Sequence, residues 1–549
     1  MTSPSAQQVR TAGAGIVLLT LCAGQFLMAL DSSVMNVSIA QVANDIGTTV
    51  TGIQTAITAY TLVMATLMIT GGRLGEIWGR KRAFSIGAVI YGAGSLTTAL
   101  APNLAVLLLG WSLLEGIGAA LILPAVVALV ASNVPAPGRP KAYGAIAASA
   151  AIAIAVGPLI GGLCATYFSW RLVFAGEVVL VLVILLLSRK MQAAPGTPAK
   201  LDLIGTALSA AALGLIVYGI LRAGSWGFVR PKGDAPSFLG LSLVVWMILS
   251  GLVLLLAFAA WERRLERTGG APLVRLQILE HAQLRAGLFA FFFQFLVQMG
   301  LFFVVPLYLA VALGLSTIAT GIRILPLSIG LLAAAALVPR IWPHASPRRI
   351  VRIGFVALLA GVVILMGALD IGSGPEIVLL PLLLAGLGMG ALASQLGSVT
   401  VSAVADEEAA QVGGLQNTVT NLGASIGTAL AGAILIAALT STLLTGLAAD
   451  SRVPQAIADQ ASVTLDSGAP FVSDAQLETV LTEAGTPTDV RTAILEQNTN
   501  ARLAGLRMAL AVLAMLTVVA LFFTGGIPTT PAVGALEDPS AAISHRRDS

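Results

Sequence analysis

The chain has 549 residues, of which 57% are hydrophobic and only 10% are charged. Soluble domains carry roughly 25% charged residues, so this composition excludes a string of soluble domains, a cytosolic enzyme and a nucleic-acid binder. The net charge of +4 predicts no basic patch, and the two cysteines, Cys22 and Cys164, lie in apolar runs that form no disulfide framework. The class that remains is a polytopic helical membrane protein.

Fourteen apolar runs follow one another along the chain, and each is close to the roughly 20 residues that a membrane-spanning helix needs. The runs are 15–38, 53–73, 83–101, 104–131, 142–166, 170–188, 202–222, 238–261, 284–311, 318–340, 350–370, 376–402, 413–442 and 503–524. Because their number is even, both termini are predicted on one side of the membrane. Arginine and lysine concentrate in the segments on that side, which the positive-inside rule identifies as the cytoplasm.

Two polar segments are predicted to lie outside the membrane. Residues 443–502 form a long outer loop in which Ser473 and Asp474 begin a short capped helix. A solvated lid or spacer is one interpretation of this loop, and a specific docking site is the other. Residues 525–549 are expected to be a disordered tail on the cytoplasmic side.

The loop after the second run contains residues that membrane topology alone does not require. Basic residues such as Arg80 would satisfy the positive-inside rule alone. This loop also has a glycine at each end, Gly72 and Gly79, which lets two helices meet in a short turn. Between the glycines lies an acid, Glu76. The alternating charges predict an inter-helix latch that breaks when the protein changes conformation.

The fifth run contains a second candidate gating element, a glycine and proline pattern. Gly157 and Gly161 lie one turn apart on one helix face and permit close packing of a neighbouring helix. Pro158 is expected to bend the helix between them. A simple packing seam explains the small residues but does not explain the proline.

Three carboxylates lie inside apolar runs: Asp31, Glu115 and Glu177. An ionised acid at the middle of a bilayer costs at least about 2.5–3.5 kcal/mol, so each is a candidate for proton coupling, and Asp31 and Glu115 also for substrate binding. The alternatives are a helix-end cap for Asp31, a neutral hydrogen-bonded structural acid for Glu115 and a buried hydrogen bond to a neighbouring helix for Glu177.

Two later runs carry polar side chains that suggest a substrate cavity. In the ninth run Gln294 and Gln298 lie one turn apart among phenylalanines such as Phe295, a composition that suits a roomy cavity for amphiphilic aromatic molecules. In the thirteenth run Asn417 and Asn421 share a helix face. The alternatives are lipid-facing phenylalanines in the first case and hydrogen bonds between helices in both.

Three of these patterns resemble motifs of the major facilitator superfamily. The loop after the second run is similar to G-x-L-x-D-x-x-G-R-K, with Glu76 in place of the aspartate, and the fifth run resembles the antiporter motif G-x-x-x-G-P-x-x-G-G, with Ala153 in place of the first glycine. Residues 30–37, which include Asp31 and Asn36, resemble the L-D-x-T-x-x-N-V signature of the 14-span drug:proton antiporter family. The resemblance also implies that Asn36 contacts substrate.

The resemblance implies an all-α membrane fold of fourteen transmembrane helices, arranged as two six-helix bundles plus two central inserted helices. The implied division is a cytoplasmic N-terminus at 1–14, an N-terminal bundle at 15–190, inserted helices and linkers at 191–270, a C-terminal bundle at 271–524 that includes the outer loop, and a cytoplasmic tail at 525–549.

The fourth run departs from the family pattern R-x-x-Q-G-x-G. Ser112 stands in the place of the arginine and Glu115 in the place of the glutamine, while Glu177 stands where the family commonly has asparagine. The usual cation near Asp31 is therefore missing, and two acids are added. Burial without a cationic partner favours the protonated form of a carboxyl group, which proton coupling requires.

The expected function is proton-coupled export of small amphiphilic drugs, cationic or neutral, across a bacterial plasma membrane by alternating access. The expected partners are the substrate, protons and the bilayer, with a proton gradient in place of a cofactor, no metal, no nucleic acid and a monomeric state. One alternative is a dedicated exporter of an endogenous metabolite or antibiotic, another is an importer, and a third is a membrane enzyme or receptor. The three histidines, His281, His344 and His545, are too scattered to favour an enzyme.

Overall fold

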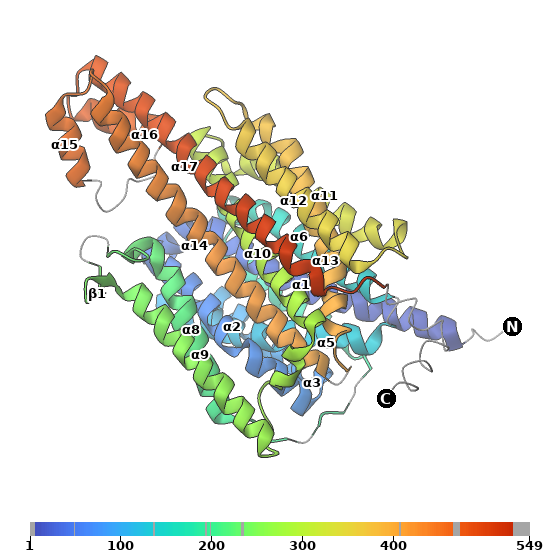
Figure 1. Cartoon of the computed structure of the whole chain (residues 1–549). Coiled ribbons are helices and arrows are strands. Elements are labelled where there is room, and N and C mark those ends of the chain that lie inside the picture. Colours follow the sequence, from blue (N-terminus) through green and yellow to red (C-terminus); the bar gives the residue numbers. More distant parts are fainter. Residues whose placement is uncertain are drawn as a thin grey trace.

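The computed structural model describes residues 6–48, 50–135, 138–192, 195–197, 199–231, 235–405, 408–464 and 473–530. Helices account for nearly all of this part of the chain (Figure 1). In the first half they are α1 (Ala6–Asp45), α2 (Val50–Trp78), α3 (Arg80–Ala99), α4 (Leu104–Leu107), the π-helix η1 (Leu108–Glu115), α5 (Gly116–Asn133), α6 (Arg139–Tyr167), α7 (Arg171–Ser188), α8 (Leu203–Trp226) and α9 (Leu243–Arg267).

The second half continues in the same way. Its elements are η3 (Leu276–Glu280), α10 (Ala282–Leu307), the π-helix η4 (Tyr308–Ala312), α11 (Thr317–Ile341), α12 (Pro347–Ala368), η5 (Pro375–Val378), α13 (Leu379–Val401), α14 (Ala409–Ala449), α15 (Gln455–Thr464), α16 (Asp474–Glu483), α17 (Thr488–Phe522) and η7 (Phe523–Gly526). A two-stranded antiparallel hairpin, β1 (Ser237–Phe238) and β2 (Leu241–Ser242), lies between α8 and α9.

Every predicted apolar run falls mainly on helix, although the run predicted at 238–261 begins in the hairpin and becomes helical only at Leu243. Not every helix meets a strict criterion for a membrane span. Among the described residues, twelve helices are long and apolar enough to cross a membrane by length and composition. The two runs not counted are α3 and α6. Helix α3 begins with Arg80, Lys81 and Arg82 and is rich in glycine, serine and threonine, which lowers its hydropathy. Several side chains of α6 lie outside the described residues.

The helices of the first half pack as one bundle. Helix α1 lies against α6 and α7, and α3 lies against α5, η1 and α7. Large apolar side chains, among them Phe84, Tyr91 and Trp111, fill the interior of this bundle. Helices α4, η1 and α5 follow one another without a break. Glu115 is the last residue of the π-helix η1, and regular α-helix resumes directly after it.

The helices of the second half form a second bundle. Helix α13 lies between α11 and α12, and α14 lies between α10 and α17. The apolar core of this bundle includes Phe355, Leu358 and Leu396. The two bundles meet through α2 against α14 and through α6 against α11 and α13.

Helices α8 and α9 form a pair that stands beside the two bundles (Figure 1). They pack on each other, and α8 also contacts both α2 and α14. Each begins with a side-chain cap, because Asp202 accepts a hydrogen bond from the Ile204 amide and Ser242 accepts one from the Val244 amide. Because α8 contacts a helix of each bundle, the pair covers one side of the junction between the bundles.

Helices α14 and α17 extend beyond the bundle, and α15 and α16 lie at this end (Figure 1). We call this end the cap end and residues 440–502 the cap. The expected capped helix is confirmed: Ser473 accepts from the Gln476 amide, and the Gln476 side chain accepts from the Ser473 amide. The cap has its own apolar core, which includes Leu447, Val490 and Ile494. It is therefore a small helical unit rather than a plain loop.

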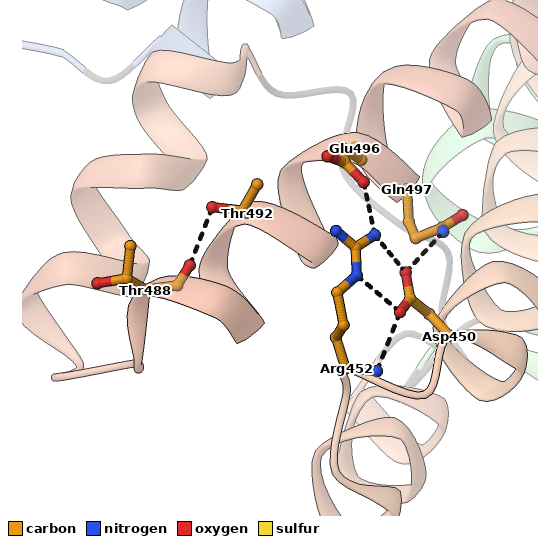
Figure 2. A network of polar contacts seen from close by, with 6 residues as sticks. All are labelled: Asp450, Arg452, Thr488, Thr492, Glu496 and Gln497. Atoms are coloured by element: carbon orange, nitrogen blue, oxygen red, sulfur yellow. Dashed lines mark hydrogen bonds and ion pairs between the residues drawn. The ribbon is translucent and has the colours of Figure 1, made fainter.

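A polar network ties the start of the cap to α17 (Figure 2). The Arg452 guanidinium donates to both oxygens of Asp450, at 3.0 Å and 2.7 Å, and to Glu496 at 2.5 Å. The Gln497 amide donates to Asp450 at 3.2 Å. These hydrogen bonds, those from Arg452 first, hold the pKa of Asp450 well below its usual range.

Part of the predicted tail is also ordered. The Arg348 guanidinium donates to the Ile527 carbonyl at 2.7 Å, and the Arg348 amide donates to the Pro528 carbonyl. Residues 527 and 528 therefore pack against the start of α12, although we expected disorder from 525 onward. Residues 531–549 lie outside the described residues.

The cap network makes a prediction about stability and pH. Asp450→Asn should raise amide hydrogen exchange in α15 and the first three turns of α17 at neutral pH, since it removes the charge that Arg452 holds. Because the pKa of Asp450 is lowered on folding, its stabilisation is present above the unfolded pKa of about 3.9 and is lost as pH falls through the folded value. The difference between variant and wild type should therefore shrink below about pH 4. Glu478→Gln, an exposed acid on α16, is the matched control, and equal exchange in both variants would contradict the prediction.

Candidate functional site

The three predicted intramembrane acids meet at one point inside the first bundle. Asp31 comes from α1, Glu115 from the end of η1 and Glu177 from α7. One carboxylate oxygen of each lies within 4.8 Å of the others. Asp31 and Glu115 have no exposed surface, and Glu177 is 2% exposed. Sequence reasoning placed each acid in a membrane span but did not predict that they form a cluster, which we call the acid triad.

Among the described residues, the groups that donate hydrogen bonds to the acid triad are neutral. The Trp111 indole donates to Asp31 at 2.7 Å, the Thr98 hydroxyl to Glu115 at 3.3 Å and the Ser95 hydroxyl to Glu177 at 3.1 Å. The second oxygen of each carboxylate has no partner in the described part of the chain. There, no arginine, lysine or histidine forms an ion pair with any of the three.

The electrostatics of this arrangement favour bound protons. Two unit negative charges 4.8 Å apart repel each other by about 3.5 kcal/mol at an effective dielectric constant of 20. Three such charges, buried and without a cation, are not all ionised together, because each added charge raises the repulsion on the other two. The triad can therefore hold protons that the carboxylates share, and it can release them when its surroundings change.

The local fold explains how the acids come so close. A Cβ atom at Gly94 of α3 would lie 2.6 Å from the Glu115 Cγ, so only glycine at this position leaves room for the glutamate. The π-helix that ends at Glu115 is a type of distortion often found at functional sites. Tyr60 stacks on Trp111 with ring centroids 5.1 Å apart, which orients the indole towards Asp31.

The predicted latch loop lies at the opposite end of the molecule from the cap, and we call this the latch end. Glu76 accepts from the Arg73 guanidinium at 2.6 Å and from the Gln411 amide of α14 at 3.0 Å. A Cβ atom at Gly72 would lie 2.8 Å from the Ala410 carbonyl oxygen, so the backbones of α2 and α14 nearly touch. The two bundles are therefore closed against each other here.

The remaining residues of the loop shape the turn between α2 and α3. Gly79 has a φ of 90°, a conformation that side chains disfavour. The Arg80 guanidinium donates to the Ala128 carbonyl of α5 at 3.4 Å. Gly79 therefore allows the tight turn and Arg80 holds the loop against the first bundle, while Glu76 reaches the second.

The glycines of the fifth predicted run lie on the seam between α6 and α1. A Cβ atom at Gly157 would lie 2.5 Å from the Ser33 Cβ, and one at Gly161 would lie 3.1 Å from a Val34 methyl group. Ser33 also donates to the Ile154 carbonyl at 3.2 Å. Packing of α1 on α6 thus leaves no room for a side chain at Gly157 and little room for one at Gly161. The side chains of Pro158 and Asn36 lie outside the described residues.

A cavity of about 240 Å³ lies between the two bundles, and we call it the central cavity. Four predicted substrate-binding residues line it: Gln294, Phe295, Gln298 and Asn417. Its lining also includes Gln416, the neighbour of Asn417, and three residues that sequence reasoning missed: Gln25, Ser328 and Thr420. A glutamine within the first apolar run was a signal that could have identified Gln25.

The acid triad does not line the central cavity. Asp31 and Glu115 lie within the first bundle, although Ala29, two residues before Asp31 on α1, is part of the lining. A substrate in this cavity would therefore not touch the triad. Any effect of the triad on the substrate would pass through α1. That Asp31 and Glu115 contact the substrate directly remains a prediction.

A second, larger cavity of about 1010 Å³ lies beside the central cavity, and we call it the lateral cavity. Asn421 lines the lateral cavity, whereas Asn417, one turn earlier on α14, lines the central one. Met299 of α10 contributes to both linings. The helix face that we predicted for the two asparagines is thus divided between two neighbouring cavities.

Comparison with protein families gives one match, and it covers most of the chain. The model described as Major Facilitator Superfamily matches residues 21–428. A puromycin resistance protein of Streptomyces alboniger is 33% identical over 427 residues, which cover 75% of this chain and 80% of that protein. A probable actinorhodin transporter of Streptomyces coelicolor is 30% identical over 503 residues, which cover 88% of this chain and 79% of that protein.

Solved structures support the same fold at lower identity. A proton:xylose symporter superposes with a TM-score of 0.53 at 13% identity, over 96% of this chain and all of that chain. The human organic anion transporter MFSD10 superposes with a TM-score of 0.54 at 14% identity, over 95% of this chain and all of that chain. Identities this low indicate shared architecture only.

The latch geometry makes a prediction about access. Glu76→Ala should weaken closure at the latch end, since Glu76 is the acceptor that joins α2 to Gln411 of α14. A cysteine placed at Ser328 in the central cavity should then react severalfold faster with a thiol reagent applied from the latch end. Glu280→Ala, an exposed acid at the same end, serves as the control. Equal reaction rates in wild type and Glu76→Ala would show that the loop is not a latch.

Proposed function

Because the chain belongs to the Major Facilitator Superfamily, a family of secondary transporters rather than enzymes, we propose that it exports small amphiphilic molecules in exchange for protons. The observation that carries the proposal is the acid triad, a buried group of three carboxylates with no cation partner among the described residues. A relative named as a puromycin resistance protein and another named as a tetracenomycin C resistance and export protein support export as the direction of transport.

The proposed architecture extends the twelve spans to fourteen. In this proposal α3 and α6 also cross the membrane, which completes two six-helix bundles with α8 and α9 inserted between them in sequence. Both termini and the latch end then face the cytoplasm, as the distribution of basic residues predicts, and the cap faces outward. The protein works as a monomer in a bacterial plasma membrane, with no cofactor other than the proton gradient.

The proposed cycle uses alternating access between the bundles. With the latch closed, the triad takes protons from the outside as substrate leaves towards the cap end. Opening of the latch exposes the central cavity to the cytoplasm, where the triad releases its protons and new substrate enters. One charge that crosses 100 mV supplies about 2.3 kcal/mol. That energy supports a roughly 50-fold gradient of a neutral substrate for each proton.

The lining of the central cavity supports a broad substrate class. Glutamine and asparagine amides alternate there with phenylalanine rings, such as Phe291 and Phe295. Amides offer both donors and acceptors, and the rings offer flat apolar surfaces. Amphiphilic aromatic molecules that are neutral or cationic suit this lining, and the buried negative triad nearby favours cations over anions.

A dedicated exporter of one antibiotic or metabolite is the second candidate. It is favoured by relatives named for single compounds, actinorhodin and tetracenomycin C, in antibiotic-producing Streptomyces. Competition between chemically unrelated compounds in an efflux assay separates the two candidates. Mutual inhibition supports a multidrug exporter, and resistance to a single compound supports a dedicated one.

The proton-coupling proposal predicts the behaviour of Asp31→Asn. The variant should lose uphill, proton-driven dye efflux in everted vesicles, because it removes one titrating group from the triad. It should retain exchange of labelled for unlabelled substrate at equal pH, which requires alternating access but no proton gradient. Asp370→Asn, an exposed acid near the end of α12, is the control. Normal uphill efflux by Asp31→Asn would remove Asp31 from the mechanism.

A further inference from the structure

The lateral cavity lies between the inserted helix α8 and the second bundle. Its walls are formed by α2, α8, α10 and α14, and by residues 227–231 after α8. We propose that this cavity is a second substrate site, an exit vestibule that holds the exported amphiphile after it leaves the central cavity, with α8 as its wall against the bilayer. The inference rests on the proposed export function and adds a role for the inserted helices.

The volumes of the two cavities support the lateral cavity as the site that a substrate occupies in this conformation. Pockets for drug-sized ligands are about 300–1,000 Å³. The central cavity, at about 240 Å³, is below this range, whereas the lateral cavity, at about 1010 Å³, is at its upper limit. With the latch closed, a drug-sized molecule therefore has room beside α8 but not between the glutamines of α10.

The two cavities share one flexible side chain in their linings. Met299 of α10 lines both, and Asn417 and Asn421 of α14 lie one on each side of it. Methionine has three rotatable bonds and adapts its shape readily, so it can let a molecule pass without backbone movement. In this proposal a substrate leaves the Asn417 amide in the central cavity, passes Met299 and reaches the Asn421 amide in the lateral cavity.

The position of the lateral cavity gives the direction of this movement. Close contacts between the bundles lie towards the latch end, where Gly72 meets Ala410. The lateral cavity instead follows α14 away from the latch, as far as Thr440 and Ser441, the first residues of the cap. Its rim carries the exposed side chains of Phe228 and Arg230, in the segment before α9. The cavity therefore leads towards the cap end.

The lining has the chemistry of an amphiphile site. On α14, Asn421, Ser425 and Thr428 form a polar row along the helix. Facing it are aliphatic residues of α8, such as Ile220, and the Phe303 ring of α10. A molecule with one polar edge and one apolar face matches these two walls. Since α8 contacts both α2 and α14, it forms one wall of this space at the junction of the bundles.

Two alanines on the same stretch of α14 allow a matched test. Ala433 lines the lateral cavity and Ala438 does not, although both are half-buried. Ala433→Trp should fill the cavity and reduce efflux of ethidium and puromycin severalfold in an efflux-deficient host, at unchanged protein level in the membrane. Ala438→Trp should leave efflux close to wild type. Equal efflux by the two variants would overturn the proposal.

Cysteine labelling tests occupancy independently of transport. In a background with Cys22→Ser and Cys164→Ser, the Ala433→Cys variant should react with a charged thiol reagent from the cap side, and puromycin should slow the reaction severalfold. Ala438→Cys should show no such protection. Protection by membrane lipid rather than by puromycin, visible as faster labelling after delipidation, would mean that an acyl chain fills the cavity and would refute the proposal.

The outcomes separate this inference from the proposed function. Export of both probes by wild type, with no protection at Ala433→Cys, refutes the vestibule and leaves export standing. Protection at Ala433→Cys without proton-dependent export refutes the proposed function and leaves the site standing.

Discussion

The constraint that governs this molecule is the repulsion among three carboxylates buried within 4.8 Å of one another. No basic side chain in the described residues offsets their charge, and their hydrogen-bond donors are an indole and two hydroxyl groups. Neutral donors stabilise a partly protonated cluster without fixing it in one state, whereas an arginine would hold it ionised. A group of this kind can take up and release protons within a membrane bundle.

The first bundle is packed so that it accommodates the three carboxylates. Gly94 makes room for Glu115, and the stack of Tyr60 on Trp111 orients the donor for Asp31. Because α1 carries Asp31 and, two residues earlier, Ala29 in the wall of the central cavity, a shift of α1 alters both sites together. Closure at the latch end, where Glu76 reaches Gln411, then couples the first bundle to the second.

Much of this arrangement could be predicted from the sequence, and the limits have physical causes. Hydropathy located the helices, and Ser473 followed by Asp474 predicted a capped helix that the structure confirms. Glutamines on one face of a phenylalanine-rich helix predicted a cavity wall, and Gln294 and Gln298 line one. Sequence reasoning gave the depth of each acid but not its rotation about the helix axis, so the convergence of Asp31, Glu115 and Glu177 was not foreseen. Nor does periodicity reveal where one cavity ends and another begins, as Asn417 and Asn421 show.

The π-helix from Leu108 to Glu115 gives the fourth predicted run a torsional freedom that its neighbours lack. A π turn holds more residues than an α turn, so its rewinding to regular geometry moves the residues after it by about 100° for each residue taken up. Glu115 is the last residue of that stretch. A local change of winding, with no sliding of whole helices, would therefore swing one carboxylate away from the other two and change how many protons the remaining pair retains.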